Sequence, residues 1–187
     1  FEEEDTYELS PVVAGMPAIP RGVSLHEYQN DAIAAWIDNG MRGIFDMATG
    51  TGKTYTGLGA AAKAFELNKR LAVIIVAPYQ HLVDQWVEDI VKFNMRPTIG
   101  YSSSPQKNWK HRLENDVLDF ELGIIDAFCF VTTNATYSSA FVQKLLDKLG
   151  KDTLLIVDEA HNFGSLHLSL KLNPKFAFRL ALSATLE

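Results

Sequence analysis

The sequence predicts an α/β fold in which a parallel β-sheet is covered by helices on both faces. From residue 21 onward, short apolar runs alternate with amphipathic segments of helical length. The apolar runs show little alternation of polar and apolar residues, which is typical of strands buried on both faces. A glycine-containing loop joins the first of these runs directly to a helical segment. Together these patterns predict three layers, with the sheet in the middle.

The elements follow from the periodicity of each segment and from signals at its ends. Strands are predicted at residues 42–47, 71–78, 125–133, 153–158 and 177–185. Helices are predicted at residues 25–39, 53–67, 81–93, 105–121 and 138–149. In the last helix, Ser138 can cap the N-terminus, Lys148 lies in the last turn and Gly150 follows the end.

Length and charge predict one globular domain preceded by a linker. The chain has 187 residues, of which 47% are hydrophobic, and this is enough for one substantial core. Residues 1–20 combine an acidic start with several prolines and predict an extended linker, which leaves residues 21–187 as the domain. The acidic start accounts for most of the net charge of −6, so the domain itself is nearly neutral. A neutral domain neither requires nor excludes a nucleic-acid partner.

The remaining bulk features predict a soluble, cytoplasmic protein with no membrane partner. No apolar stretch approaches the roughly 20 residues that a membrane span requires, and the N-terminus lacks a signal-peptide pattern. Cys129 is the single cysteine and lies in an apolar run, so we expect a buried thiol and no intramolecular disulfide. Because the chain starts at Phe1 and stops directly after a strand-like run, we expect it to be a piece of a longer protein.

The loop 47-MATGTGKT-54 predicts a phosphate-binding site. Gly50 and Gly52 allow the backbone amides to turn inward around phosphates, where the following helix N-terminus adds positive potential. Lys53 can reach the β- and γ-phosphates, and the Thr54 hydroxyl can bind Mg²⁺. We therefore expect the nucleotide to contact every residue of the loop after the first, including Ala48, Thr49 and Thr51.

A second motif, 158-DEAH-161, follows the apolar run 153–157. A carboxylate at the tip of a parallel strand faces the crevice where α/β sheets bind ligands. Asp158 can therefore hold Mg²⁺ through its water shell, and Glu159 can polarise an attacking water. With Lys53, these two residues are the predicted catalytic groups.

The loop MATGTGKT, DEAH and 183-SAT-185 occur in the order and at the approximate spacing of motifs I, II and III of superfamily 2 helicases and translocases. Residues 21–187 resemble this family, which implies the first RecA-like motor domain of a P-loop NTPase that uses ATP and Mg²⁺. The segment 25-LHEYQNDAIAAW-36 looks like the family's glutamine motif, which implies that Gln29 reads the adenine edge. The resemblance also assigns coupling between the phosphate site and domain movement to His161, Ser183 and Thr185.

Two further segments resemble family loops that touch the nucleic-acid backbone. The segment 76-VAPYQHLVDQW-86 looks like motif Ia, and 131-VTTNATY-137 looks like the strand-end threonine motif that follows it. The implied nucleic-acid contacts are Pro78, His81, Thr132 and Thr133. The motif set is most similar to double-stranded DNA translocases, including restriction-enzyme motor subunits and repair helicases, and less similar to the RNA-directed DEAD-box branch. The sequence departs from the family patterns at Met47, Tyr79, Gln80 and Leu186.

The resemblance implies in-line attack of water on the γ-phosphate of ATP, with arginines supplied by a second RecA-like domain. Because residues 1–187 contain only the first domain, we expect them to bind nucleotide but to hydrolyse it slowly. In a longer protein the cycle would drive movement on nucleic acid, with double-stranded DNA preferred over RNA, and restriction or phage defence is the expected setting.

Other functions fit parts of the same pattern. A nucleotide-dependent nucleic-acid sensor or clamp would keep Lys53, Asp158 and Glu159 with slow turnover. An RNA helicase would share most of the motifs. Small-molecule kinases and protein-remodelling ATPases also use phosphate loops, but the glutamine motif and the SAT triplet disfavour them.

Overall fold

The structure is a computed structural model that describes residues 15–48, 52–160 and 174–185, and it contains a six-stranded parallel sheet. The strands are β1 (Arg42–Ala48), β2 (Leu71–Ala77), β3 (Thr98–Gly100), β4 (Ala127–Thr133), β5 (Thr153–Val157) and β6 (Phe178–Thr185). Their order across the sheet is β1-β6-β5-β2-β4-β3, and each pair of neighbours is parallel. The predicted fold class is confirmed.

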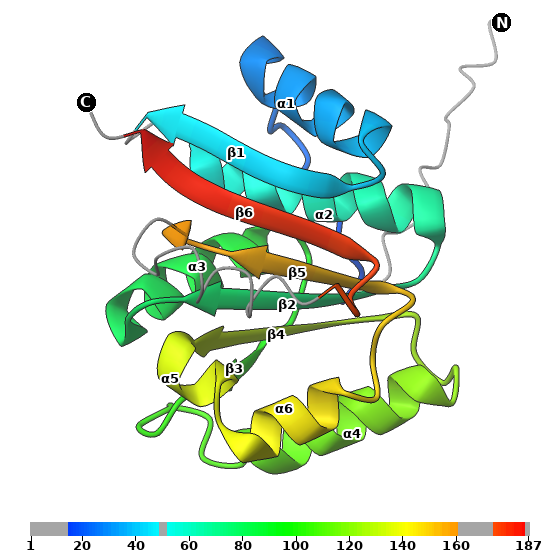
Figure 1. Cartoon of the computed structure of the whole chain (residues 1–187), viewed down its shortest axis with the longest axis vertical. Helices are drawn as coiled ribbons and strands as arrows, with labels where there is room; N and C mark the ends of the chain where they lie inside the picture. The colour runs from blue at the N-terminus through cyan, green and yellow to red at the C-terminus, as the bar shows by residue number, and fades with distance from the viewer. Residues whose placement is uncertain (1–14, 49–51, 161–173, 186–187) are drawn as a thin grey trace, which may run out of the picture.

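Helices cover both faces of this sheet. They are α1 (Glu27–Asp38), α2 (Lys53–Asn68), α3 (Gln80–Lys92), α4 (Trp109–Glu121), α5 (Asn134–Tyr137) and α6 (Ala140–Leu146). Buried side chains of α1, α2 and α3 belong to one core cluster, and those of α4, α5 and α6 belong to a second. In Figure 1, α2 and α3 pass behind the strands, whereas α4 and α6 lie together at the bottom of the view. The sheet is therefore the middle of three layers.

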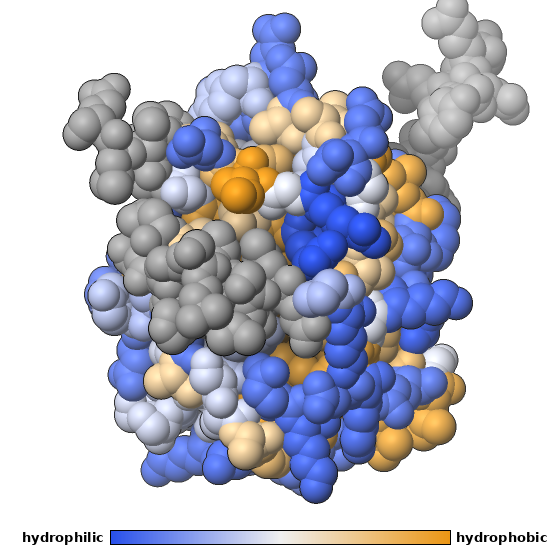
Figure 2. All heavy atoms as spheres, in the orientation of Figure 1, coloured by the Kyte–Doolittle hydropathy of each residue, from blue (hydrophilic) through white to orange (hydrophobic). Residues whose placement is uncertain are grey.

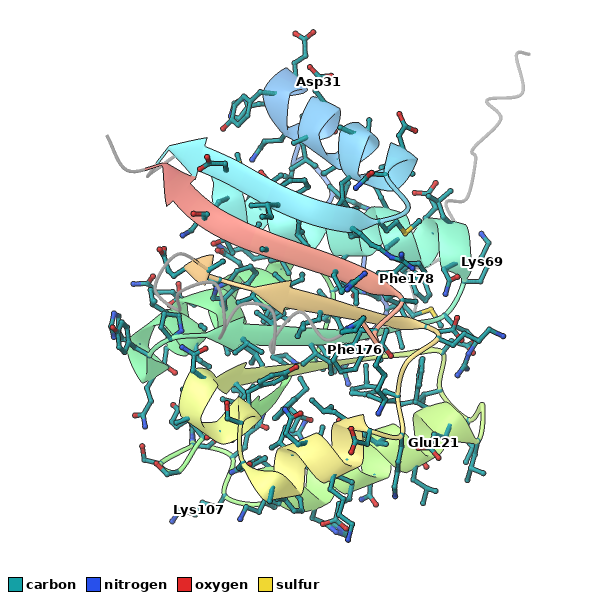
Figure 3. All side chains as sticks on the ribbon, viewed as in Figure 1. Asp31, Lys69, Lys107, Glu121, Phe176 and Phe178 are labelled. Carbon is teal, nitrogen blue, oxygen red and sulfur yellow. The ribbon has the colours of Figure 1, made fainter. Side chains whose placement is uncertain are left out.

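The central strands are buried on both faces, as the low alternation of their sequences predicts. All residues of β2 and β5 are buried. Along β2, Ile75 joins the core cluster of α1–α3 and Ile74 joins that of α4–α6. Phe176, just before β6, belongs to the α4–α6 cluster, whereas Phe178, the first residue of β6, packs against the α1–α3 cluster. Both lie at the end of the strand opposite its arrowhead (Figure 3). Cys129 on β4 is 2% exposed, and burial raises the pKa of its thiol.

Strand β1 lies at the edge of the described sheet, with β6 as its neighbour, and the side chains on one of its faces are exposed. Phe45 and Met47 point into the core, whereas Ile44 is 58% exposed and Asp46 is also exposed. Figure 2 shows apolar surface among hydrophilic side chains on the face of the molecule that it views. The strand that leads into the phosphate-binding loop is thus supported from one side only.

The predicted helix at residues 138–149 is the shorter helix α6 in the structure, and it is preceded by α5, a four-residue helix that was not predicted. Thr133 caps α5 by accepting a hydrogen bond from the N–H of Thr136, and Ser139 caps α6 by accepting one from the N–H of Val142. Ser138 is the residue that ends α5, so its predicted capping role is wrong. The helix α6 ends at Leu146, and Lys148 and Gly150 therefore lie beyond it.

Two other segments differ from the sequence-based expectation. Strand β3 was not predicted, because it has three residues and pairs with one neighbour, β4. At the other end of the chain, residues 15–18, assigned to the linker, bond to the segment after α3. The N–H of Gly15 donates to Asn94 O at 2.9 Å, and that of Ala18 donates to Phe93 O at 3.0 Å. Packed structure therefore begins before residue 21.

All the described strands end at the same edge of the sheet, where their arrowheads point in Figure 1. The end of β1, the start of α2 and the residue after β5 lie at this carboxyl edge. Residues far apart in the sequence therefore meet there. No helix in the described part of the chain is long and apolar enough to cross a membrane.

Candidate functional site

The centre of the site is an ion-pair cluster at the carboxyl edge. Lys53 is the first residue of α2, while Asp158 and Glu159 directly follow β5. The Lys53 ammonium lies 3.1 Å from Asp158 Oδ1 and also donates a hydrogen bond to Glu159 Oε1. Parallel strand order explains the meeting, because β1 and β5 both flank β6 and deliver the two segments to one edge. The three predicted catalytic residues are thus brought together.

The cluster keeps Lys53 charged. Burial alone would lower the pKa of the ammonium, but the hydrogen bond to Glu159 and the attraction of Asp158 outweigh it. The pKa of Lys53 is therefore raised above its ordinary value. Lys53 is therefore a cation at the N-terminus of a helix whose amides also favour anions, and its two partners are carboxylates.

Asp158 is almost fully enclosed, and its two oxygens have different partners. Oδ1 faces Lys53 and accepts a hydrogen bond from the N–H of Glu159 at 2.8 Å. Oδ2 accepts a hydrogen bond from the indole N–H of Trp86 at 2.7 Å. The N–H of Asp158 donates to Val76 O, which extends the sheet by one bond beyond β5. The carboxylate is therefore held in one orientation.

Sequence reasoning missed Trp86. It lies on α3 and is 2% exposed, and the amphipathic pattern of that segment was sufficient to predict its burial. A buried indole N–H also requires a hydrogen-bond acceptor, so the sequence indicates that Trp86 has one. Nothing in the local sequence shows that the acceptor is Asp158.

Glu159 has an uncommon backbone conformation. Its φ of 52° lies in the left-handed region, where a non-glycine residue is strained. Its side chain is 21% exposed, compared with 4% for Asp158. The two neighbouring carboxylates therefore differ in environment: one is enclosed and the other reaches toward solvent.

Gln29 connects α1 to the predicted phosphate-binding loop. Its side chain is 3% exposed, and its Nε2 donates to Gly52 O and to Thr56 Oγ1, both at 3.1 Å. Its Oε1 accepts a hydrogen bond from the N–H of His26 at 2.8 Å. An amide oxygen can accept a second hydrogen bond. Gln29 therefore supports the loop with its donors and retains an acceptor.

A pocket with a volume of about 420 Å³ lies beside this connection. It is lined by residues before and within α1, by Gly52 at the end of the loop and by Tyr55 on α2. At its rim, the rings of His26 and Tyr28 stack 5.6 Å apart. The pocket has the size of a small-molecule site and borders the predicted phosphate-binding loop.

The other loop residues are described only in part. Thr49, Gly50 and Thr51 lie outside the described residues, and Ala48 ends β1. Gly52 has a φ of 76°, and a Cβ there would lie 2.9 Å from Gln29 Nε2, so both backbone and space require glycine. Thr54 is half-buried in the first turn of α2.

The predicted coupling residues lie beside the strand that leads into the loop. In the ladder between β1 and β6, Ser183 pairs with Asp46 and Thr185 pairs with Ala48. The SAT segment thus runs next to the last residues of β1. His161 lies outside the described residues.

The predicted nucleic-acid contacts separate into two pairs. Pro78 is half-buried after β2 and His81 is exposed at the start of α3, where its ring stacks on that of Tyr79. Thr132 is fully buried and donates a hydrogen bond to Gly100 O at 2.6 Å. Thr133 is 7% exposed and caps α5. The first pair is accessible to a ligand, whereas the second is engaged within the protein.

The family model for the res subunit of type III restriction enzymes matches residues 22–187. The chain belongs to this ResIII family. No match was found among curated proteins. The ResIII assignment covers the whole sheet, including the loop and both acidic residues of the cluster.

Solved structures of similar fold include a restriction-modification enzyme, an ATPase core and a helicase. The first is a nuclease-deletion mutant of the type ISP restriction-modification enzyme LlaGI with a DNA substrate mimic, at a TM-score of 0.67 and 20% identity, covering 87% of this chain and 18% of that one. The Sulfolobus solfataricus SWI2/SNF2 ATPase core with double-stranded DNA has a TM-score of 0.63 and 18% identity, covering 91% and 34%. The UvsW helicase from bacteriophage T4 has a TM-score of 0.63 and 19% identity, covering 91% and 56%. The chain thus spans between about a fifth and just over half of the proteins whose fold it shares.

Proposed function

We propose that this chain is the ATP-binding first RecA-like motor domain of a superfamily 2 helicase or translocase of the DEAH-box type. The observation that carries the proposal is the contact of Lys53 with both Asp158 and Glu159 at the carboxyl edge. Ligands of parallel α/β sheets bind outside this edge. ResIII membership and the fold shared with DNA-directed motors support the proposal.

In this proposal the loop residues 48–54 hold the phosphates of ATP. Their amides and the N-terminus of α2 face the β- and γ-phosphates, and Lys53 exchanges its carboxylate partners for phosphate oxygens. Gln29 accepts a hydrogen bond from the adenine amino group with its remaining acceptor site, next to the pocket beside α1. The base and the phosphates would then be bound by adjacent segments.

The donor set suits Mg²⁺ because it consists of oxygens, from the Thr54 hydroxyl and the Asp158 carboxylate. In the described part of the chain, no three His, Cys, Asp or Glu side chains form a metal site. When bound, Mg²⁺ neutralises charge on the phosphates, while Asp158 keeps its orientation through Trp86 and the N–H of Glu159.

Glu159 is the group proposed to orient and polarise the attacking water. Its side chain is more exposed than that of Asp158, which leaves it accessible to water. Ser183 and Thr185, beside β1, would transmit changes at the loop to the rest of the motor, together with His161. A second RecA-like domain would supply the arginines that complete the site.

Pro78 and His81 are the proposed contacts to the nucleic-acid backbone, since they are the accessible pair. Double-stranded DNA is the proposed track, and a restriction or phage-defence system is the proposed setting. The type ISP relatives in fold are restriction-modification enzymes, one solved with a DNA substrate mimic and another bound to DNA.

The test uses a chain in which these residues are joined to the proposed second motor domain. We expect double-stranded DNA to stimulate ATP hydrolysis, and Glu159→Gln to abolish the stimulated rate while ATP binding remains. An unchanged rate with double-stranded DNA, single-stranded DNA and RNA would contradict the motor function. Stimulation without displacement of a bound strand or protein would instead identify a sensor or clamp.

A second test uses residues 1–187 alone. We expect these residues to bind ATP and to hydrolyse it slowly, because no second domain completes the site. Rapid turnover that disappears in Lys53→Ala would show that this domain is sufficient, and the proposed division of the site would be wrong.

A further inference from the structure

Trp86 connects three elements at the proposed ATP site. It projects from α3, and its indole N–H donates to Asp158 Oδ2 at 2.7 Å in a buried hydrogen bond. The opposite end of the ring faces Gly57 on α2, where an added Cβ would lie 3.4 Å from Trp86 Cη2. One rigid side chain therefore spans from the strand end that carries Asp158 to the helix that begins with Lys53.

The contact with α2 lies on the face that carries Lys53. Gly57 is four residues after Lys53, and positions four apart in a helix lie one above the other. The indole therefore fixes the distance between the helix face of Lys53 and the carboxylate of Asp158. A residue with a side chain at position 57 would press on Trp86 and on Leu182, whose Cδ1 would lie 3.1 Å from the new Cβ.

We propose that Trp86 is a positioning residue that orients Asp158 for Mg²⁺ in the Mg²⁺–ATP complex. The proposal deepens the proposed function and rests on it. By holding Oδ2, Trp86 turns Oδ1 toward Lys53 and the phosphate side of the site. Outer partners that orient a metal-binding carboxylate typically change metal affinity by about 10- to 100-fold when they are removed.

Removal of the indole N–H would free the carboxylate to rotate. Asp158 would keep the hydrogen bond from the N–H of Glu159 and the contact with Lys53, so it would remain in the site. It would no longer be held in one orientation when Lys53 moves to the phosphates. The substitution should therefore reduce the gain in nucleotide affinity that Mg²⁺ provides. It should leave the affinity measured without Mg²⁺ unchanged.

Trp36 offers a matched control. It is also buried, at 3% exposed, and its indole N–H donates to a backbone oxygen, that of Arg179, at 2.9 Å. Trp36→Phe and Trp86→Phe each remove one buried indole hydrogen bond and a similar volume. If Trp86 served only the core, the two substitutions would have the same effect on nucleotide binding.

The experiment measures the affinity of residues 1–187 for ATPγS by calorimetry, in Mg²⁺ and in EDTA. For Trp86→Phe we expect the gain in affinity from Mg²⁺ to fall at least about 10-fold, with the affinity in EDTA unchanged. Trp36→Phe should leave both affinities as in the wild type. An undiminished Mg²⁺ gain in Trp86→Phe, or an equal loss in Trp36→Phe, would overturn the positioning role. Absence of any Mg²⁺ gain in the wild-type chain would instead overturn the proposed function itself.

A spectroscopic measurement on the wild-type chain decides the matter even if Trp86→Phe fails to fold. The chain has three tryptophans, so its ¹H–¹⁵N spectrum has three indole signals, and Trp36→Phe and Trp109→Phe identify that of Trp86 by elimination. We expect the Trp86 signal to move when Mg²⁺ is added to the ATPγS complex in EDTA, and to move further than the other two. A Trp86 signal that does not respond to Mg²⁺ would overturn the proposal.

Discussion

Replacement of Gln29 by alanine tests how the phosphate-binding loop is held against α1. The change removes three hydrogen bonds, from Nε2 to Gly52 O and Thr56 Oγ1, and from the N–H of His26 to Oε1. The side chain is 3% exposed, so water cannot readily replace these bonds. The substitution should therefore affect both the stability of the chain and the recognition of the base.

The expected loss of stability follows from the bonds that remain. Gly52 O still accepts from the hydroxyl and from the N–H of Thr56, both at 3.0 Å, so no buried carbonyl is left without a partner. The cost should thus stay near the sum of three hydrogen bonds, about 3 kcal/mol in the free energy of unfolding. For a chain of this size, that corresponds to a fall in Tm of roughly 6–12 °C.

The assay combines thermal unfolding with binding of ATP and GTP. Gln29→Ala should reduce the preference for ATP over GTP by about tenfold, because adenine donates where guanine has an oxygen. Thr56→Val is the control, since it removes one bond of Nε2 and the bond from the Thr56 hydroxyl to Gly52 O, and it leaves the Gln29 acceptor in place. It should lower Tm and keep the preference.

Two results would refute this reasoning. An unchanged Tm in Gln29→Ala would show that the three hydrogen bonds do not stabilise the fold. An equal loss of base preference in Thr56→Val would show that the preference comes from packing of the loop and not from Gln29.

Three other predictions concern stability and reactivity. Lys53→Met should lower the free energy of unfolding of the nucleotide-free chain by about 2 kcal/mol, because two carboxylates lose a partly buried cation. The pKa of Lys53 is raised in the folded chain, so its ion pairs contribute their full stability at any pH below its ordinary pKa. Urea titrations at about pH 7 and about pH 9 should therefore give the same difference in free energy of unfolding between the wild type and Lys53→Met. A smaller difference at pH 9 would contradict this. Gly100→Ala should cost about 1–3 kcal/mol, because the new Cβ would lie 2.5 Å from Phe130 Cε2; unchanged urea unfolding would show that the ring can move aside. Cys129, buried with a raised thiol pKa, should react with Ellman's reagent only after unfolding, and rapid reaction of the folded chain would disprove its burial.

The sequence was sufficient to predict the long elements and the centre of the site. The strands preceding Lys53 and Asp158 are apolar runs, and parallel strands deliver their ends to one edge whatever their order. Strand β3 escaped prediction because three residues carry no measurable periodicity. Helix α5 and the start of α6 depend on whether Thr133 and Ser139 accept hydrogen bonds from nearby N–H groups, and Ser139 stands beside Ser138, an identical residue that could equally cap the helix.

The residues that sequence reasoning placed least well are those whose role depends on distant partners. Helical periodicity predicts that Trp86 is buried, but its acceptor lies 72 residues away. Thr132 was selected by resemblance to a family loop, and its buried hydroxyl bonds to Gly100 across the β3–β4 pair. Gln29 was selected in the same way, and its bonds to Gly52 O and Thr56 Oγ1 could not be read from α1 alone.

The position of β1 at the edge of the sheet has a thermodynamic consequence for the proposed ATP site. The loop that carries Lys53 emerges from a strand with a single described ladder, to β6, and edge segments of this kind open at lower free energy than the central strands. If a nucleotide binds only the state in which β1 is paired with β6, it raises the free energy of local opening of β1 by RT ln(1 + [L]/Kd). Nucleotide binding should therefore slow the opening of β1. Amide hydrogen exchange along Arg42–Ala48 would then report nucleotide occupancy, as a binding titration does.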